Sequence, residues 1–89
     1  MKEVLYFYSE TCPYCIQADE LIEEIKKENA KYNSIVIRRV EENLNHDFAE
    51  KFDYYYVPCM YVDGEKIIEG TNCTKQNLIK MFDGIVGKK

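Results

Sequence analysis

The sequence has no apolar run that approaches the ~18 residues needed for a membrane-spanning helix. Residues 1–8 include Lys2 and Glu3 and have neither a long apolar core nor a small-residue cleavage site, so we expect no signal peptide. The sequence also has no repeat, linker or low-complexity segment, and its single histidine, His46, has no expected catalytic role. We therefore expect a cytoplasmic protein with no membrane partner, in a compartment where thiols are kept reduced.

Positive charge is in the minority, because 12 Lys and Arg residues face 16 Asp and Glu residues and the formal net charge is −4. Nucleic acid is therefore not an expected partner, since duplex binding usually requires a clustered basic surface. Apolar residues make up 46% of the chain, enough for a packed core without disulfide staples. With 89 residues, the chain is expected to form one domain over residues 1–89 and to be a monomer.

The most informative motif is Cys12-Pro13-Tyr14-Cys15, which follows a short apolar run at residues 4–8 and precedes a stretch with helical periodicity. A cysteine at the start of a helix lies over unpaired N–H groups, which favour its thiolate. Pro13 fits the first helical position, where a missing N–H costs nothing. Cys15 lies on the same face of the turn and can reach back. The motif predicts an attacking thiolate, Cys12, and a resolving thiol, Cys15.

The hydrophobic pattern alternates between strands and helices. We expect strands at residues 3–8, 35–40, 57–62 and 66–68 and helices at residues 13–29, 44–52 and 74–85. Asp63-Gly64 is a hairpin signal, and Thr74 is expected to cap the last helix. For the middle helix, Asn43 or Asn45 is the expected cap and Leu44, Phe48, Ala49 and Phe52 form the expected apolar face. The order β-α-β-α-β-β-α predicts an α/β fold with a parallel crossover followed by an antiparallel hairpin.

A second landmark is Tyr56-Val57-Pro58, directly before the third expected strand. Proline lacks the N–H that a central strand needs, so Pro58 belongs at the first residue of the strand, at an edge or at a bulge. Only ~5–6% of X–Pro bonds in folded proteins are cis, so these residues alone leave the isomer of Pro58 open. In the run of three tyrosines at residues 54–56, alternation places at least one side chain inward.

Together, the C-P-Y-C motif, Val57-Pro58, the Asp63-Gly64 turn and Gly70 before the last helix resemble the thioredoxin superfamily. Within it, C-P-Y-C resembles the motif of dithiol glutaredoxins, and the resemblance covers essentially the whole chain. It implies the thioredoxin fold, a four-stranded mixed sheet flanked by three helices. It also implies a cis Pro58 beside the nucleophilic sulfur and a Val57 backbone that pairs with the substrate or with glutathione.

The resemblance implies a glutathione-dependent thiol-disulfide oxidoreductase. Cys12 would attack a protein disulfide or a glutathione mixed disulfide, and Cys15 would resolve the intermediate. Glutathione would be a co-substrate rather than a tightly bound cofactor, with protein disulfides as the other partners and no metal. The residues expected to contact glutathione are Tyr14, Val57, Pro58, Thr71 and Asn72.

The sequence departs from the glutaredoxin pattern in three places. Glu10 stands where a basic residue is usual, Tyr56 stands where threonine is common, and the G-G-x-D loop is only partly kept at residues 70–73. An acid at position 10 should weaken anion binding and oppose thiolate formation at Cys12. The alternative is therefore a small thioredoxin-like protein disulfide reductase that is recycled by a flavoprotein reductase.

The remaining cysteines leave a third alternative open. Cys59 and Cys73 could join Cys12 and Cys15 as ligands, which would make the chain a metal or iron–sulfur carrier. The simpler interpretation of Cys59 is a small buried apolar residue, and Cys73, in a loop, is expected to be exposed. Arg38-Arg39 and the acidic residues 19–24 are interpreted as solvated charges.

Overall fold

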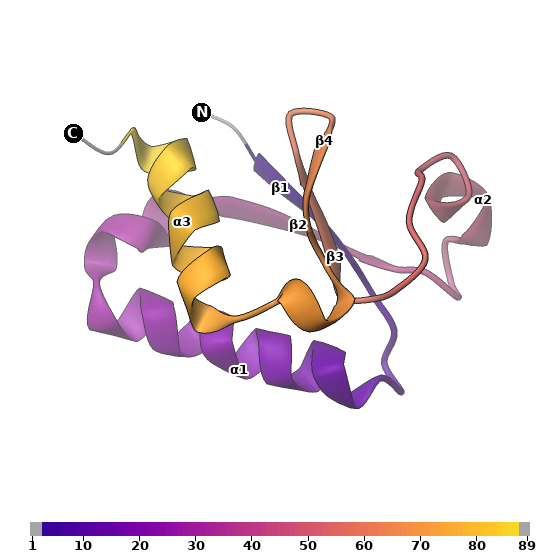
Figure 1. Cartoon of the computed structure of the whole chain (residues 1–89), viewed down its shortest axis with the longest axis horizontal. Helices are drawn as coiled ribbons and strands as arrows, with labels where there is room; N and C mark the ends of the chain where they lie inside the picture. Colours follow the sequence, from indigo (N-terminus) through magenta and orange to yellow (C-terminus); the bar gives the residue numbers. More distant parts are fainter. Residues whose placement is uncertain (1–2, 88–89) are drawn as a thin grey trace.

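The computed structural model describes residues 3–87 and has the expected order of elements (Figure 1). The strands are β1 (Glu3–Tyr8), β2 (Val36–Glu41), β3 (Cys59–Val62) and β4 (Glu65–Glu69). The α-helices are α1 (Pro13–Glu28), α2 (His46–Ala49) and α3 (Lys75–Val86), and two 3₁₀ turns are η1 (Ala30–Ser34) and η2 (Gly70–Asn72). Among the described residues, no helix combines the length and the apolar character needed to cross a membrane.

The four strands form one mixed sheet in the order β2-β1-β3-β4. β1 pairs with β2 in parallel and with β3 antiparallel, and β3 pairs with β4 antiparallel. Helices α1 and α3 lie on one side of the sheet and α2 lies on the other (Figure 1). This arrangement confirms the α/β thioredoxin fold, with its parallel crossover and its antiparallel hairpin.

Alternation along β1 divides the core between the two faces of the sheet. Val4 and Tyr6 are fully buried in a cluster that includes residues of α1 and α3, whereas Phe7 is fully buried in a second cluster on the α2 side. On the first face, α1 and α3 contribute Ala18, Ile22, Ile25, Leu78, Met81 and Phe82. The expected apolar faces of both long helices are therefore the buried ones, and burial of such faces supplies most of the driving force for folding.

The turns follow their sequence signals. Asp63 and Gly64 have φ values of 56° and 82°, the paired positive angles of a type I′ hairpin. The hydroxyl of Thr74 accepts a hydrogen bond from the backbone N–H of Asn77 at 3.2 Å, which confirms Thr74 as the N-cap of α3.

The middle helix differs from the expectation. α2 is a single short turn, and Leu44 is 78% exposed rather than buried. Asn45 occupies the N-cap position, as expected, but its side chain donates back to the Glu41 carbonyl and makes no capping hydrogen bond. The physical reason is that the Glu41 carboxylate accepts the backbone N–H groups of Asn43 and Leu44, which fixes a turn where the periodicity predicts helix. The expected packing of this segment is kept by Phe48 and Phe52, whose rings contact Phe7.

Candidate active site

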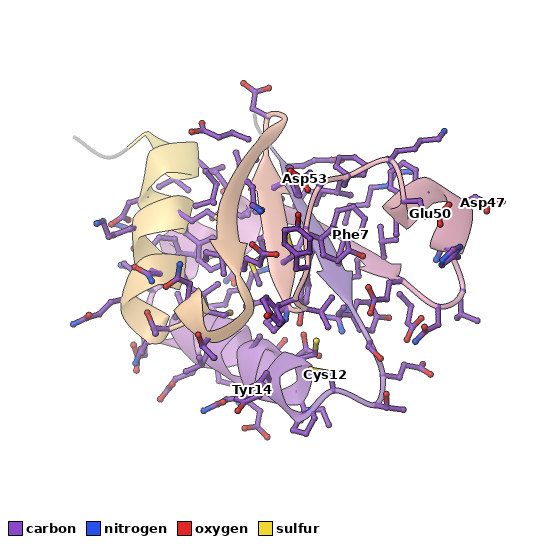
Figure 2. All side chains as sticks on the ribbon, turned by 45° about the vertical axis from the view of Figure 1, so that its right-hand side comes forward. Phe7, Cys12, Tyr14, Asp47, Glu50 and Asp53 are labelled. Atoms are coloured by element: carbon purple, nitrogen blue, oxygen red, sulfur yellow. The ribbon has the colours of Figure 1, made fainter. Side chains whose placement is uncertain are left out.

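The structure places Cys12 at the N-cap of α1, where the chain leaves β1 through a tight turn. Its backbone N–H donates to the Ser9 carbonyl at 3.1 Å, and its own carbonyl accepts from the N–H groups of Cys15 and Ile16. Pro13 opens the helix, as its missing N–H predicts. Figure 2 shows Cys12 and Tyr14 together at this end of α1.

The nucleophile faces the segment before β3. The Cys12 Sγ lies 3.8 Å from the carbonyl oxygen of Val57 and donates a weak hydrogen bond to it. The Val57–Pro58 peptide bond is cis, and Pro58 is buried with its carbonyl oxygen accepting from the Gly70 N–H at 2.8 Å. Val57 and Pro58 therefore lie beside the sulfur, and β3 begins only at Cys59 rather than at Val57.

The two thiols of the motif differ in access. Cys12 is half-buried, whereas Cys15 is 1% exposed. Burial, together with the interactions with Cys12, raises the pKa of the Cys15 thiol to about 12, and a backbone hydrogen bond from Ser9 partly opposes this rise. A substrate disulfide can reach Cys12 but not Cys15, which fits the assignment of Cys12 as attacking thiol and Cys15 as resolving thiol.

A polar network that the sequence analysis missed lies behind Cys15. The buried Tyr6 hydroxyl donates to the Cys15 carbonyl at 3.2 Å. One helical turn further along α1, Asp19 accepts two hydrogen bonds from the Arg39 guanidinium, at 2.7 and 2.9 Å. The same guanidinium lies over the rings of Tyr6 and Tyr8. Arg39 and Asp19 remain partly solvated, as expected, with side chains 43% and 35% exposed, but they also form an ion pair with each other that the sequence does not mark.

Glu41 anchors the loop that carries Cys12. It is buried at the end of β2, and its carboxylate accepts the N–H groups of Glu10 at 2.9 Å, Asn43 at 2.7 Å and Leu44 at 3.1 Å. These hydrogen bonds, that from Glu10 first, hold the pKa of the Glu41 carboxyl below its ordinary value. The loop on one side of the nucleophile is thus tied to the neighbouring strand, which sequence periodicity does not reveal.

Glu69, at the end of β4, anchors the other side. Its carboxylate accepts the N–H groups of Tyr55 and Tyr56 and lies 2.9 Å from the Lys66 ammonium. These contacts, that from Tyr55 first, lower the pKa of the Glu69 carboxyl to about 2. In the tyrosine run, Tyr54 stacks inward on Phe7 as alternation predicts, while Tyr55 and Tyr56 stay exposed. Glu69 therefore fixes the loop that presents Val57 to Cys12.

The residues expected to contact glutathione are only partly gathered. Tyr14, 56% exposed, and Thr71 line a cavity of about 350 Å³ between α1 and η2, together with Gly70 and Cys73. Val57 and Pro58 lie at the Cys12 sulfur, as described above. Asn72 is exposed and outside that lining; its carbonyl accepts from the Asn77 side chain at 2.8 Å.

The other two cysteines do not join the pair in a ligand cluster. Cys59 is fully buried beside Phe7, in keeping with a small apolar role, and burial raises its pKa to about 12. Cys73 is half-buried against the core rather than exposed as expected, and burial raises its pKa to about 11.

The possible metal ligands lie elsewhere in the fold. Within residues 3–87, the ligating atoms of three side chains come within 4.8 Å of one another at His46, Asp47 and Glu50, all exposed, and at no group of cysteines. The zinc or iron–sulfur alternative therefore has no preassembled set of thiol ligands in the described residues.

Comparison with known proteins agrees with this geometry. The structure is similar to the oxidised thioredoxin of Plasmodium falciparum, with a TM-score of 0.72 and 18% identity over 97% of this chain and 82% of that one. It is similar to mitochondrial thioredoxin 3 of Saccharomyces cerevisiae, with a TM-score of 0.72 and 18% identity over 93% and 77% of the two chains. For Fasciola hepatica thioredoxin the TM-score is 0.72, at 18% identity over 93% and 79%. Residues 2–83 match the family model described as Thioredoxin domain, so the chain belongs to the thioredoxin domain family.

Proposed function

We propose that this chain is a dithiol thiol-disulfide oxidoreductase that reduces disulfides in polypeptides. The observation that carries the proposal is the asymmetry of the motif. The accessible Cys12 sulfur lies at a helix N-terminus, 3.8 Å from the Val57 carbonyl, while Cys15 is 1% exposed on the same helical turn. The Cys12 thiol can react with a substrate disulfide, whereas the buried Cys15 thiol can react only with the Cys12 sulfur.

The reaction has two exchange steps. The Cys12 thiolate attacks one sulfur of the substrate disulfide, a Cys12–substrate disulfide forms, and the second substrate sulfur leaves as a thiolate that takes up a proton. Cys15 then loses its proton and attacks the Cys12 sulfur, which releases the first substrate sulfur as a thiol. The substrate gains two electrons and two protons, and the protein is left with a Cys12–Cys15 disulfide.

An external reductant must return that disulfide to two thiols. A flavoprotein disulfide reductase is the reductant that suits a thioredoxin-like protein. The exposed Glu10, two residues before Cys12, supports this choice, since its carboxylate disfavours the glutathione carboxylates. The similarity in fold to three thioredoxins points in the same direction.

The second candidate is reduction by glutathione, the route implied by the C-P-Y-C motif. The cavity of about 350 Å³ favours it, because Tyr14 and Thr71 lie there as a glutathione site requires. In this route Cys12 alone would exchange with glutathione mixed disulfides, and Val57, Pro58 and Asn72 would complete the contacts. Glu10→Lys should then tighten glutathione binding, since it replaces a repulsive charge with an attractive one.

The test of the exchange mechanism uses the pair Cys12→Ser and Cys15→Ser with a peptide disulfide, followed by mass spectrometry. Cys12→Ser should abolish reaction, and Cys15→Ser should accumulate a covalent adduct of one peptide chain on Cys12. Cys73→Ser is the control for loss of a half-buried cysteine outside the motif; it should still reduce the peptide disulfide and should accumulate no adduct. Persistent turnover in Cys12→Ser would overturn the mechanism.

The reductant is identified separately by coupled assays with glutathione and its reductase, or with NADPH and a thioredoxin reductase, alongside the Cys12–Cys15 reduction potential. A potential near about −270 mV with turnover only in the second assay identifies the thioredoxin type. A potential of about −200 to −230 mV with turnover in the first assay identifies the glutaredoxin type.

A further inference from the structure

A second cavity, of about 450 Å³, lies between the turn after β2, α2 and the tyrosine run. Its lining includes the side chains of Glu42, His46, Glu50, Phe52, Tyr54 and Tyr55. We refer to this site as the acidic cavity. Its lining includes two carboxylates, and no Lys or Arg is among its lining residues, although Lys51 follows Glu50 in the chain.

The acidic cavity combines carboxylates with aromatic rings. The Tyr54 hydroxyl donates to the Glu42 carboxylate at 2.8 Å, which leaves the remaining lone pairs of that carboxylate for a further donor. Glu50 lies 3.5 Å from the His46 imidazole at the rim. Tyr55 is 81% exposed, so its ring can contact a side chain that enters the cavity. A Lys or Arg side chain fits such a site, because the carboxylates can pair with its charged group and the aromatic rings can pack against its methylene groups.

The cavity is connected to the nucleophile along two chain segments. Tyr55 precedes Val57 by two residues, and the Val57 carbonyl is the atom that the Cys12 sulfur contacts. On the other side, the Glu42 N–H donates to the Tyr8 carbonyl at 2.9 Å, four residues before Cys12. An extended peptide covers roughly 3.3 Å per residue, so a side chain about three to five residues from the attacked cysteine can reach the cavity. Figure 2 shows Cys12 at the start of α1 and Glu50, the residue that follows α2.

The acidic cavity differs in charge from the cavity beside Tyr14. The one lined by Tyr14 and Thr71 includes Lys75 and no carboxylate, whereas the acidic cavity has Glu42 and Glu50. The exposed Glu10 carboxylate, two residues before Cys12, adds negative charge near the nucleophile. A polypeptide with a basic residue near its disulfide is therefore attracted to the acidic side and oriented by it.

We propose that the acidic cavity is a specificity pocket for a Lys or Arg side chain of the polypeptide substrate, a few residues from the cysteine that Cys12 attacks. The inference rests on the proposed function, because it concerns which disulfides the same thiol pair reduces. It assigns Glu42 and Glu50 as the residues that select the substrate, with Tyr55 and Phe52 as the apolar wall.

The test compares two nonapeptides with a central cysteine in a disulfide with thionitrobenzoate, whose release is coloured. They differ only in carrying lysine or glutamate at the third and fourth positions on each side of the cysteine. We expect pre-reduced protein, in a single turnover, to release thionitrobenzoate from the lysine peptide with a second-order rate constant about tenfold higher than from the glutamate peptide at low ionic strength. The ratio should be smaller at high salt. Glu42→Gln/Glu50→Gln should bring this ratio below about twofold.

The matched control is Glu20→Gln/Glu23→Gln, which removes the same charge from two exposed positions of α1. It should keep most of the tenfold ratio. Both peptides are measured with the same preparation of each variant, so a partial loss of folded protein cancels in the ratio. If the double variant does not fold, the single Glu50→Gln variant replaces it in the test. If the ratio fell equally in both double variants, the net charge of the protein alone would select the lysine peptide, and the proposed specificity pocket would be wrong.

The same assay separates failure of the pocket from failure of the proposed function. Equal reduction of both peptides by the wild-type protein would overturn the pocket and leave the exchange activity intact. No reduction of either peptide or of 2-hydroxyethyl disulfide, which has no side chain to enter the cavity, would overturn both.

Discussion

The Tyr6 hydroxyl, on the central strand, donates a hydrogen bond to the carbonyl oxygen of Cys15 across 3.2 Å. Tyr6 is fully buried, so this bond joins the core of the sheet directly to the backbone of the resolving cysteine. A buried phenol has few ways to satisfy its hydroxyl, and the first turn of α1 provides one. The position of Cys15 relative to Cys12 is therefore set by core packing as well as by the helix.

Removing that hydroxyl should affect both stability and the second exchange step. Tyr6→Phe keeps the ring and deletes one hydrogen bond, so unfolding in urea should show a loss of about 1 kcal/mol. The mixed disulfide on Cys12 should persist several-fold longer, because Cys15 is held less firmly for its attack. Stopped-flow release of the substrate thiol measures that lifetime.

Tyr32→Phe is the matched control, since Tyr32 is also buried and its hydroxyl donates to Asp83 at 2.6 Å, away from the motif. It should cost about 1.5–3 kcal/mol, as expected for a hydrogen bond to a charged group, and leave the lifetime of the mixed disulfide unchanged. Equal lifetimes in the Tyr6 and Tyr32 variants would contradict a positioning role for Tyr6.

The buried thiols predict a pH dependence of the stability of the reduced protein. Cys15 and Cys59 titrate at about 12 when folded, against an ordinary value of 9.0. Between these pKa values the unfolded chain has released protons that the folded chain still holds, so the free energy of unfolding must fall as pH rises above about 9. The fall is up to about 1.4 kcal/mol per pH unit for each thiol.

Urea unfolding of the reduced protein between about pH 8 and pH 10 measures this slope. Oxidation to the Cys12–Cys15 disulfide removes the Cys15 thiol and should flatten the curve, and Cys59→Ala should flatten it independently. If the reduced and oxidised proteins lost stability equally with rising pH over this range, the Cys15 thiol would not be a cause of the pH dependence.

The lowered pKa of the Glu69 carboxyl predicts that the folded protein loses stability at low pH. Its carboxyl has a folded pKa of about 2 and an ordinary value of 4.5. Its stabilising effect is thus fully present above about pH 4.5 and is lost as pH falls toward 2. Glu69→Gln should lower stability at neutral pH and weaken the acid dependence, because the amide accepts more weakly from the Tyr55 and Tyr56 N–H groups. Thermal unfolding from pH 2 to 7 measures both effects.

The control is Glu65→Gln on the same strand, an exposed acid that should change neither quantity. Hydrogen exchange at the Tyr55 and Tyr56 amides gives a local readout, since both donate to Glu69. Faster exchange there in Glu69→Gln, and not in Glu65→Gln, is the expected result; identical exchange in both variants would count against Glu69 as the anchor of this loop.

The sequence predicts best those elements whose apolar residues recur at one regular spacing and pack against one face of the sheet. α1 has its apolar residues at helical spacing and begins at Pro13, so its expected bounds of 13–29 differ from Pro13–Glu28 by one residue. The Asp63-Gly64 turn and the Thr74 cap depend on local backbone chemistry, which the sequence carries directly. The short α2 depends instead on Glu41, whose carboxylate accepts the N–H groups of Asn43 and Leu44 and fixes a turn where the periodicity predicts the start of a helix.

The same distinction applies to the site. Cys12 and Cys15 lie three positions apart in one short motif, and that motif carries its own chemistry. The contacts between Tyr6 and Cys15, Glu41 and Glu10, and Asp19 and Arg39 join residues 9, 31 and 20 positions apart. No local pattern marks such pairs, because each partner alone looks like an ordinary core tyrosine or surface charge.

Gly70 and Gly84 provide a final prediction with opposite signs at two glycines. Gly70 has φ +62° and an added Cβ would lie 3.1 Å from the Tyr56 Cβ, so Gly70→Ala should destabilise by more than about 1 kcal/mol and shift Tyr56 beside Val57. Gly84 lies within α3 with nothing within 4 Å of an added Cβ, so Gly84→Ala should stabilise by about 0.5–1 kcal/mol. Urea unfolding measures both changes, and disulfide turnover should fall in Gly70→Ala alone. A stabilised Gly70→Ala protein would contradict the close packing of Tyr56 over Gly70.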